Sequence, residues 1–133
     1  MGTFLKLFAI ALPTFLVIDL VWLGLIARSF YRSQLGPLMR EEVSWGPAVV
    51  FYLIFVAGIV ILAAWPAIER ESFSRAVTLG AILGLVSYAA FDLTSLATLQ
   101  GFPRTMALVD LAWGTILTAS VSAITYKVWF ALT

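Results

Sequence analysis

The chain has 133 residues, of which 62% are hydrophobic and 11% are charged, and its formal net charge is +1. Soluble domains carry roughly a quarter charged residues, so this composition excludes a soluble globular domain and indicates an integral membrane protein. The length allows one domain of about four spanning helices, since each needs roughly 20 apolar residues to cross the hydrocarbon core. With a small net charge and no long basic run, the chain lacks the electrostatic footprint of a nucleic-acid-binding protein.

Cysteine and histidine are both absent from the sequence. Their absence excludes disulfides, a thiol nucleophile, a His/Cys zinc site, His-ligated haem and an imidazole general base. Any chemistry would have to use carboxylates, hydroxyls, Arg, Lys or a bound cofactor. No motif indicates a particular cofactor, so none is predicted, and the sequence leaves open whether carboxylates hold a metal ion.

The first predicted span covers residues 4–27, and we interpret it as a retained helix rather than a removed signal peptide. Pro13 lies inside it and predicts a kink, because proline removes one backbone hydrogen bond. Residues 28–46 are too polar to span the membrane and too apolar for a plain linker, which predicts a segment in the headgroup layer, with helical turns broken at Gly36-Pro37. The charged residues of this segment are Arg28, Arg32, Arg40, Glu41 and Glu42.

Three further spans are predicted over residues 47–65, 76–99 and 105–130, with Pro66 ending the second. Along the third, Gly80, Gly84, Tyr88 and Asp92 are spaced four apart and therefore share one helix face, whose small residues allow another helix to approach closely. A matching stripe on the fourth span consists of Asp110, Gly114, Thr118, Ser122 and Tyr126.

These spans predict a single all-α domain over residues 1–133, an antiparallel four-helix transmembrane bundle with an interfacial segment in the first loop. Lys and Arg divide four to four between the two sides, so the positive-inside rule predicts no orientation.

Three aspartates lie within the predicted spans. Asp19 lies nine residues before Arg28, and Asp92 and Asp110 lie twelve before and six after Arg104. At about 1.5 Å per helical residue, all three lie roughly 9 to 18 Å below the same membrane surface. An ionised aspartate at the helix centre costs around 2.5 to 3.5 kcal/mol, so we expect all three to face the bundle interior.

Two of the aspartates share a local pattern, since Trp22 and Trp113 each follow an aspartate by three residues, on the same helical face. We predict that the aspartates form a polar pocket with these indoles as walls. The candidate binding residues are Asp19, Asp92, Asp110, Trp22, Trp113, Tyr88, Thr94, Ser95, Arg104 and Arg28, with Arg104 at the mouth. Tyr31 and Tyr52 are instead expected to anchor the chain at the membrane interface.

The chain also carries a set of motifs from its first span to its last. With these motifs it resembles a family of small bacterial membrane proteins with four predicted spans, defined only as a domain of unknown function. Phe91 and Ser95 stand where the family pattern has Tyr and Asn. The resemblance implies a multi-pass protein of the bacterial inner (cytoplasmic) membrane and no established activity. The matching residues are Asp19-x-x-Trp22-Leu23-Gly24, Phe30-Tyr31, Leu35-Gly36-Pro37-Leu38, Phe51-Tyr52, Pro66, Gly80, Gly84-Leu85, Tyr88, Asp92-Leu93-Thr94, Ala97-Thr98-Leu99, Pro103 and Asp110-x-x-Trp113-Gly114.

The favoured function is a polar intramembrane pocket that binds or transports a proton, a cation, or a small polar or lipid-linked ligand. A second hypothesis is a non-catalytic structural or accessory subunit of a larger membrane complex. A third is a lipid-modifying enzyme that uses paired carboxylates, although a non-enzymatic role is favoured. The aspartates could also serve only to join helices by hydrogen bonds. Expected partners are the lipid bilayer and either a second copy of the chain or a larger complex.

Overall fold

Helices account for all the regular structure in the computed structural model, which describes residues 2–39 and 44–133. Arg40, Glu41 and Glu42, expected in the polar first loop, lie outside the described residues. In chain order the elements are α1 (Gly2–Val21), the π-helical turn η1 (Trp22–Ile26), α2 (Arg28–Leu35), the 3₁₀ turn η2 (Gly36–Leu38), α3 (Trp45–Ile59), the π-helical turn η3 (Val60–Ala64), α4 (Trp65–Glu69), α5 (Phe73–Thr98) and α6 (Arg104–Leu132).

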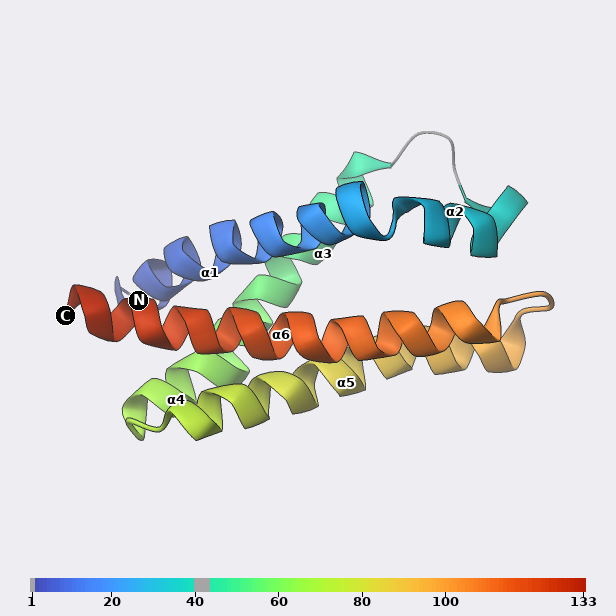
Figure 1. The fold of residues 1–133 in the computed structure, drawn as a ribbon. Helices are drawn as coiled ribbons and strands as arrows, with labels where there is room; N and C mark the ends of the chain where they lie inside the picture. Colours follow the sequence, from blue (N-terminus) through green and yellow to red (C-terminus); the bar gives the residue numbers. More distant parts are fainter. Residues whose placement is uncertain (1, 40–43) are drawn as a thin grey trace.

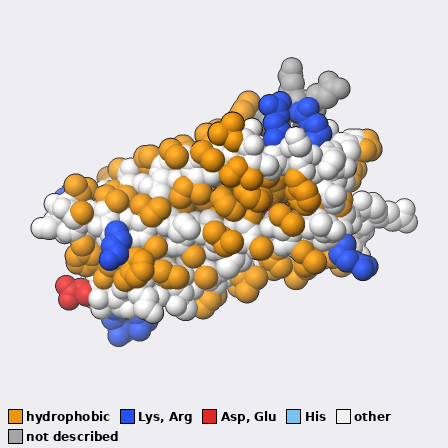
Figure 2. Space-filling model, in the orientation of Figure 1, with side chains coloured by type: hydrophobic (Ala, Val, Ile, Leu, Met, Phe, Trp, Pro, Cys, Tyr) orange, Lys and Arg blue, Asp and Glu red, His pale blue; other side chains and the backbone are white. Residues whose placement is uncertain are grey.

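Four stretches are long and apolar enough to cross a membrane: Gly2–Ile26, Trp45–Glu69, Phe73–Thr98 and Arg104–Leu132. Both termini and the α4–α5 turn lie at one end of the bundle, with α2 and the α5–α6 turn at the other (Figure 1). Apolar side chains cover the face shown in Figure 2, and most of its basic side chains lie toward the two ends. The predicted all-α membrane bundle is confirmed.

Neither Pro13 nor Pro66 ends the helix in which it lies. α1 is continuous through Pro13, where a kink is predicted, and the first irregularity is the π-helical turn at Trp22–Ile26. Pro66 does not end the second span, which continues to Glu69. Pro66 lies in the first turn of α4, directly after η3, where the regular hydrogen-bond ladder is already interrupted and its missing N–H costs little.

The interfacial segment does break where expected. α2 ends at Leu35, and Gly36 follows with φ 53°, a left-handed conformation that favours glycine. This turn closes the short helix α2, which lies beyond the end of the first span and beside the start of α6 (Figure 1).

Glycines bring α5 and α6 into close contact, as the two small-residue stripes predict. A Cβ added at Gly84 would lie 2.3 Å from the Gly114 carbonyl oxygen, and one at Gly80 would lie 2.8 Å from the Thr118 carbonyl oxygen. A Cβ at Gly114 would meet the ring of Tyr88 at 2.1 Å. Only glycine permits this separation, so the two stripes face each other along one seam.

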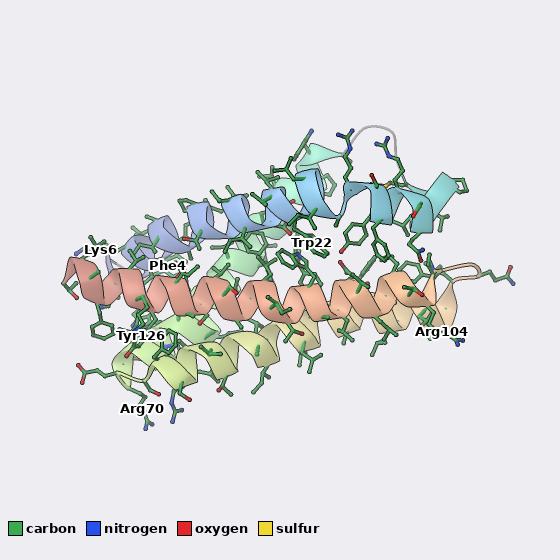
Figure 3. All side chains as sticks on the ribbon, viewed as in Figure 1. Phe4, Lys6, Trp22, Arg70, Arg104 and Tyr126 are labelled. Carbon is green, nitrogen blue, oxygen red and sulfur yellow. The ribbon has the colours of Figure 1, made fainter. Side chains whose placement is uncertain are left out.

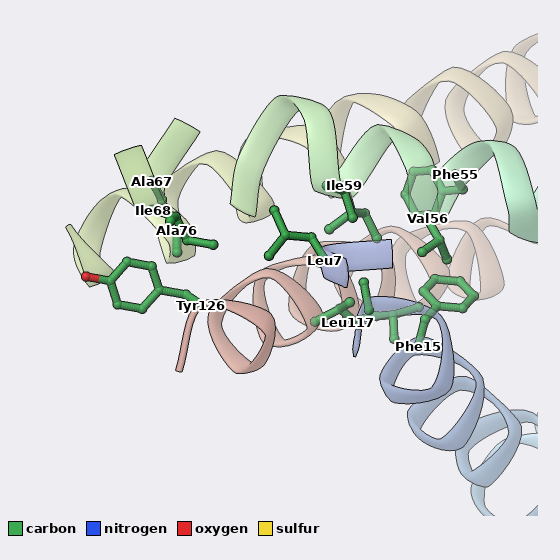
Figure 4. Close-up of a cluster of buried hydrophobic side chains, with 13 residues drawn as sticks. Leu7, Phe15, Phe55, Val56, Ile59, Ala67, Ile68, Ala76, Leu117 and Tyr126 are labelled. Carbon is green, nitrogen blue, oxygen red and sulfur yellow. The ribbon is translucent and has the colours of Figure 1, made fainter. Parts of the chain in front are cut away.

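An apolar core fills the half of the bundle that contains the chain termini. Leu7 and Phe15 of α1 are fully buried against Val56 and Ile59 of α3 and Leu117 of α6 (Figure 4). Three spans therefore interlock on this side, and the other half of the bundle holds the buried aspartates.

We expect Gly84→Ala to lower the free energy of unfolding by about 1–3 kcal/mol, because the new methyl group would overpack the α5–α6 seam. The measurement is an SDS titration of the protein in detergent micelles, followed by circular dichroism. Gly58→Ala is the matched control, since a Cβ there meets nothing within 4 Å. Equal stability of the two variants would contradict this account of the seam.

Candidate functional site

Asp19 and Trp113 join the first and last spans. The indole Nε1 of Trp113 donates a hydrogen bond to Asp19 Oδ1 at 3.2 Å. Trp22 stacks on Trp113, with ring centroids 4.3 Å apart and planes 10° from parallel, and its indole lies between α1 and α6 (Figure 3). Asp19 is 6% exposed, so this contact is shielded from solvent by protein.

Tyr31 connects the interfacial helix α2 to Asp110 of α6. Its hydroxyl donates to Asp110 Oδ1 at 2.7 Å and accepts a hydrogen bond from Trp22 Nε1 at 3.1 Å. Burial and the bond to Asp110 raise the pKa of the Tyr31 hydroxyl, an effect that the Trp22 bond partly offsets. Tyr31 therefore keeps its proton at neutral and mildly alkaline pH and remains a donor to the carboxylate.

The two Asp-x-x-Trp motifs are linked reciprocally. Trp113, from the motif of Asp110, bonds directly to Asp19, whereas Trp22, from the motif of Asp19, reaches Asp110 through Tyr31. The two helices run in opposite directions (Figure 1), so each motif presents its indole to the aspartate of the other. The repeated pattern thus serves a contact between α1 and α6.

Asp92 of α5 differs from the other two acids. Its side chain is 0% exposed, and neither carboxylate oxygen receives a hydrogen bond from the described residues. Asp110 lies within hydrogen-bonding reach, but two ionised carboxylates have no proton to donate. A proton shared by the pair, or a positively charged group beside it, would offset the cost of burying these carboxyl groups.

No described arginine or lysine is among the groups that act on Asp19 or Asp92. The groups close to Asp19 are Trp113, Tyr52 and Asp110. Within residues 2–39 and 44–133, no group of three or more carboxylates is arranged to hold a metal ion. The cluster is therefore an acidic and aromatic one, without a basic counterion among these neighbours.

Two cavities adjoin this cluster. The first, of about 430 Å³, is lined by Phe51 of α3, by Ser87, Tyr88 and Phe91 of α5, and by Asp110 of α6. The second, of about 470 Å³, lies among the end of the first span, α2 and the start of α3, and its lining includes Tyr31 and Tyr52. Tyr31 lines the second cavity and bonds to Asp110 of the first, so their contact lies between the two spaces.

The structure brings together most of the predicted site. Asp110 lies close enough to Asp19 and to Asp92 to interact electrostatically with both. The three acids therefore lie together, as their predicted common depth indicates. Trp22 and Trp113 stack beside them, and Tyr88 packs on Gly114 and lines the first cavity. Arg28 lines the second cavity instead of contacting these acids.

Thr94, Ser95 and Arg104 are not brought into the cluster. Thr94 is exposed, and its hydroxyl donates to the Ala90 carbonyl of its own helix, which satisfies it locally. Ser95 is half-buried and lines neither cavity, and Arg104 is exposed at the first turn of α6 (Figure 3). Ser95 continues the face that Tyr88 and Asp92 share but lies beyond both cavities, whereas Thr94 lies outside that face.

Sequence reasoning missed several residues of the site. Tyr31 and Tyr52, expected to be interface anchors, contact or adjoin the aspartates. The signal for both was their occurrence in the motif pairs Phe30-Tyr31 and Phe51-Tyr52. The first cavity is also lined by three residues that were not among the candidate binding residues, namely Phe51, Ser87 and Phe91.

Comparison with known proteins identifies one family. A family model described as "Predicted membrane protein (DUF2177)" matches residues 4–127. No curated protein and no solved structure matches the chain.

Tyr31→Phe is expected to lower the free energy of unfolding by about 1–3 kcal/mol, because it leaves the carboxylate of Asp110 without its hydrogen-bond donor. An SDS titration in micelles measures the loss. Tyr126→Phe is the control, since Tyr126 is similarly buried, 9% exposed against 7% for Tyr31, and its hydroxyl bonds to no carboxylate among the described residues. Equal losses in both variants would show that the Tyr31–Asp110 bond contributes nothing.

Proposed function

The chain belongs to the DUF2177 family of predicted membrane proteins, and we propose that it binds a lipophilic organic cation in the cavity beside Asp110. The observation that carries this proposal is the lining of that cavity. Three of its lining residues are the aromatics Phe51, Tyr88 and Phe91, and its charged group is the carboxylate of Asp110. Aromatic faces and a carboxylate both attract a cation, and the rings also bind its apolar substituents.

The charge balance of the cluster supports a cationic occupant. Among the described residues, Asp92 receives no hydrogen bond, and no arginine or lysine is among the groups that affect its charge. Ionised carboxylates at this depth cost several kcal/mol without a counter-charge. A bound cation beside Asp110 offsets that cost, and a proton on the Asp92–Asp110 pair is the alternative occupant. We infer that cation and proton compete for the pair.

The position of the aromatic residues indicates a route of entry. Phe51 and Phe91 are 45% and 59% exposed on membrane-spanning helices, so they face lipid. A lipophilic cation dissolved in the bilayer would meet these rings before it reaches Asp110. The volume, about 430 Å³, lies within the usual range of roughly 300–1,000 Å³ for small-molecule sites.

We also propose the bacterial inner membrane as the location. The four apolar helices are consistent with this location, because α-helical spans are the usual architecture of inner-membrane proteins. The resemblance to bacterial membrane proteins supports a bacterial source.

Asp110→Asn should weaken binding of tetraphenylphosphonium at least tenfold, about 1.4 kcal/mol, because the substitution removes the charge and keeps the shape. Equilibrium dialysis of the protein in detergent micelles measures the binding. Glu69→Gln, which neutralises an exposed acid at the other end of the bundle, is the matched control. Tetraphenylborate, of the same shape and opposite charge, should not bind. Equal affinity for the two ions, or wild-type affinity in Asp110→Asn, would overturn the proposal.

A further inference from the structure

The second cavity differs in charge from the first. Its charged lining residues are Arg28 and Arg32, and no acidic residue is part of its described lining. The two arginines are four residues apart on α2, so they project from the same side of this helix. Guanidinium groups match the oxygens of a phosphate in geometry and charge.

The remaining wall of this cavity is apolar. Leu20 and Leu23 lie on the membrane side of the arginines and are 50% and 38% exposed, and Trp45, at the start of α3, is 59% exposed. Gly24 widens the cavity between them, since an added Cβ there would meet nothing within 4 Å. The space therefore combines a basic rim with an apolar floor, which suits an amphiphile and not a small soluble anion.

The depth of the lining residues in the membrane matches the separation of the cavity into a basic rim and an apolar floor. The first candidate span ends at Ile26, and α2 begins at Arg28. The arginines thus stand where the lipid headgroups begin, and the leucines lie at the level of the acyl chains.

We propose that this cavity is a binding site for an anionic phospholipid. Arg28 and Arg32 bind the phosphate, and one acyl chain lies along Leu20, Leu23 and Trp45. The lipid would also contact Tyr31 and so lie beside the Tyr31–Asp110 hydrogen bond. The site is separate from the cation cavity and does not depend on the function proposed for it.

Native mass spectrometry of the full chain tests this site, with phosphatidylglycerol and phosphatidylcholine of identical acyl chains added to delipidated protein. We expect at least a tenfold preference for phosphatidylglycerol in the wild type and its loss in Arg28→Gln/Arg32→Gln. Arg70→Gln/Arg75→Gln, which removes two exposed arginines around the α4–α5 turn, should keep the preference. Circular dichroism verifies that each variant is folded.

A groove-filling variant tests the acyl-chain part of the site. Gly24→Leu should reduce retention of phosphatidylglycerol at least fivefold without unfolding the protein, whereas Gly58→Leu, at another glycine with open space, should not. Glycerol phosphate should fail to compete, since it lacks the acyl chains. Equal retention of the two lipids, a preference unchanged in Arg28→Gln/Arg32→Gln, unchanged retention in Gly24→Leu, or full competition by glycerol phosphate would each overturn the proposal.

Discussion

Hydrogen bonds between aspartates and aromatic side chains hold the first and last spans together in the polar half of the bundle. Trp113 donates a hydrogen bond to Asp19, and Trp22 stacks on Trp113. Tyr31 accepts a hydrogen bond from Trp22 and donates one to Asp110. These donors partly satisfy two acids without neutralising them, because indole and phenol groups supply hydrogen bonds but no positive charge. The negative charge of the cluster therefore remains available to a cation or a proton.

The two halves of the bundle differ in the side chains that lie between the spans, and the two cavities beside the aspartates lie in the half that holds these acids. In the half with the chain termini, an apolar core and the glycine seam bring the spans together. In the other half, aspartates and the aromatic rings that bond to them or stack beside them lie between the spans. Space remains on both sides of the Tyr31–Asp110 bond, as a cavity with a carboxylate and a cavity with two arginines.

Much of this arrangement could be predicted from periodicity and composition. Four spans, the facing stripes of Gly84 and Gly114, and the common depth of the aspartates all follow from helix geometry. Tyr31 could not be placed, because the face that α2 turns inward depends on the path of the loop. Thr94 was misplaced for a different reason: adjacency to Asp92 does not imply a shared face, and its hydroxyl is satisfied by its own helix.

The Asp19–Trp113 bond couples α1 to α6, and a double-mutant cycle measures the free energy of this coupling. Asp19→Leu removes the acceptor and Trp113→Phe removes the donor, with unfolding free energies taken from SDS titrations. We expect a coupling energy of at least about 0.5 kcal/mol, whereas the losses from Asp19→Leu and Trp129→Phe should be additive within that margin. Additive losses in the Asp19–Trp113 cycle would contradict this coupling.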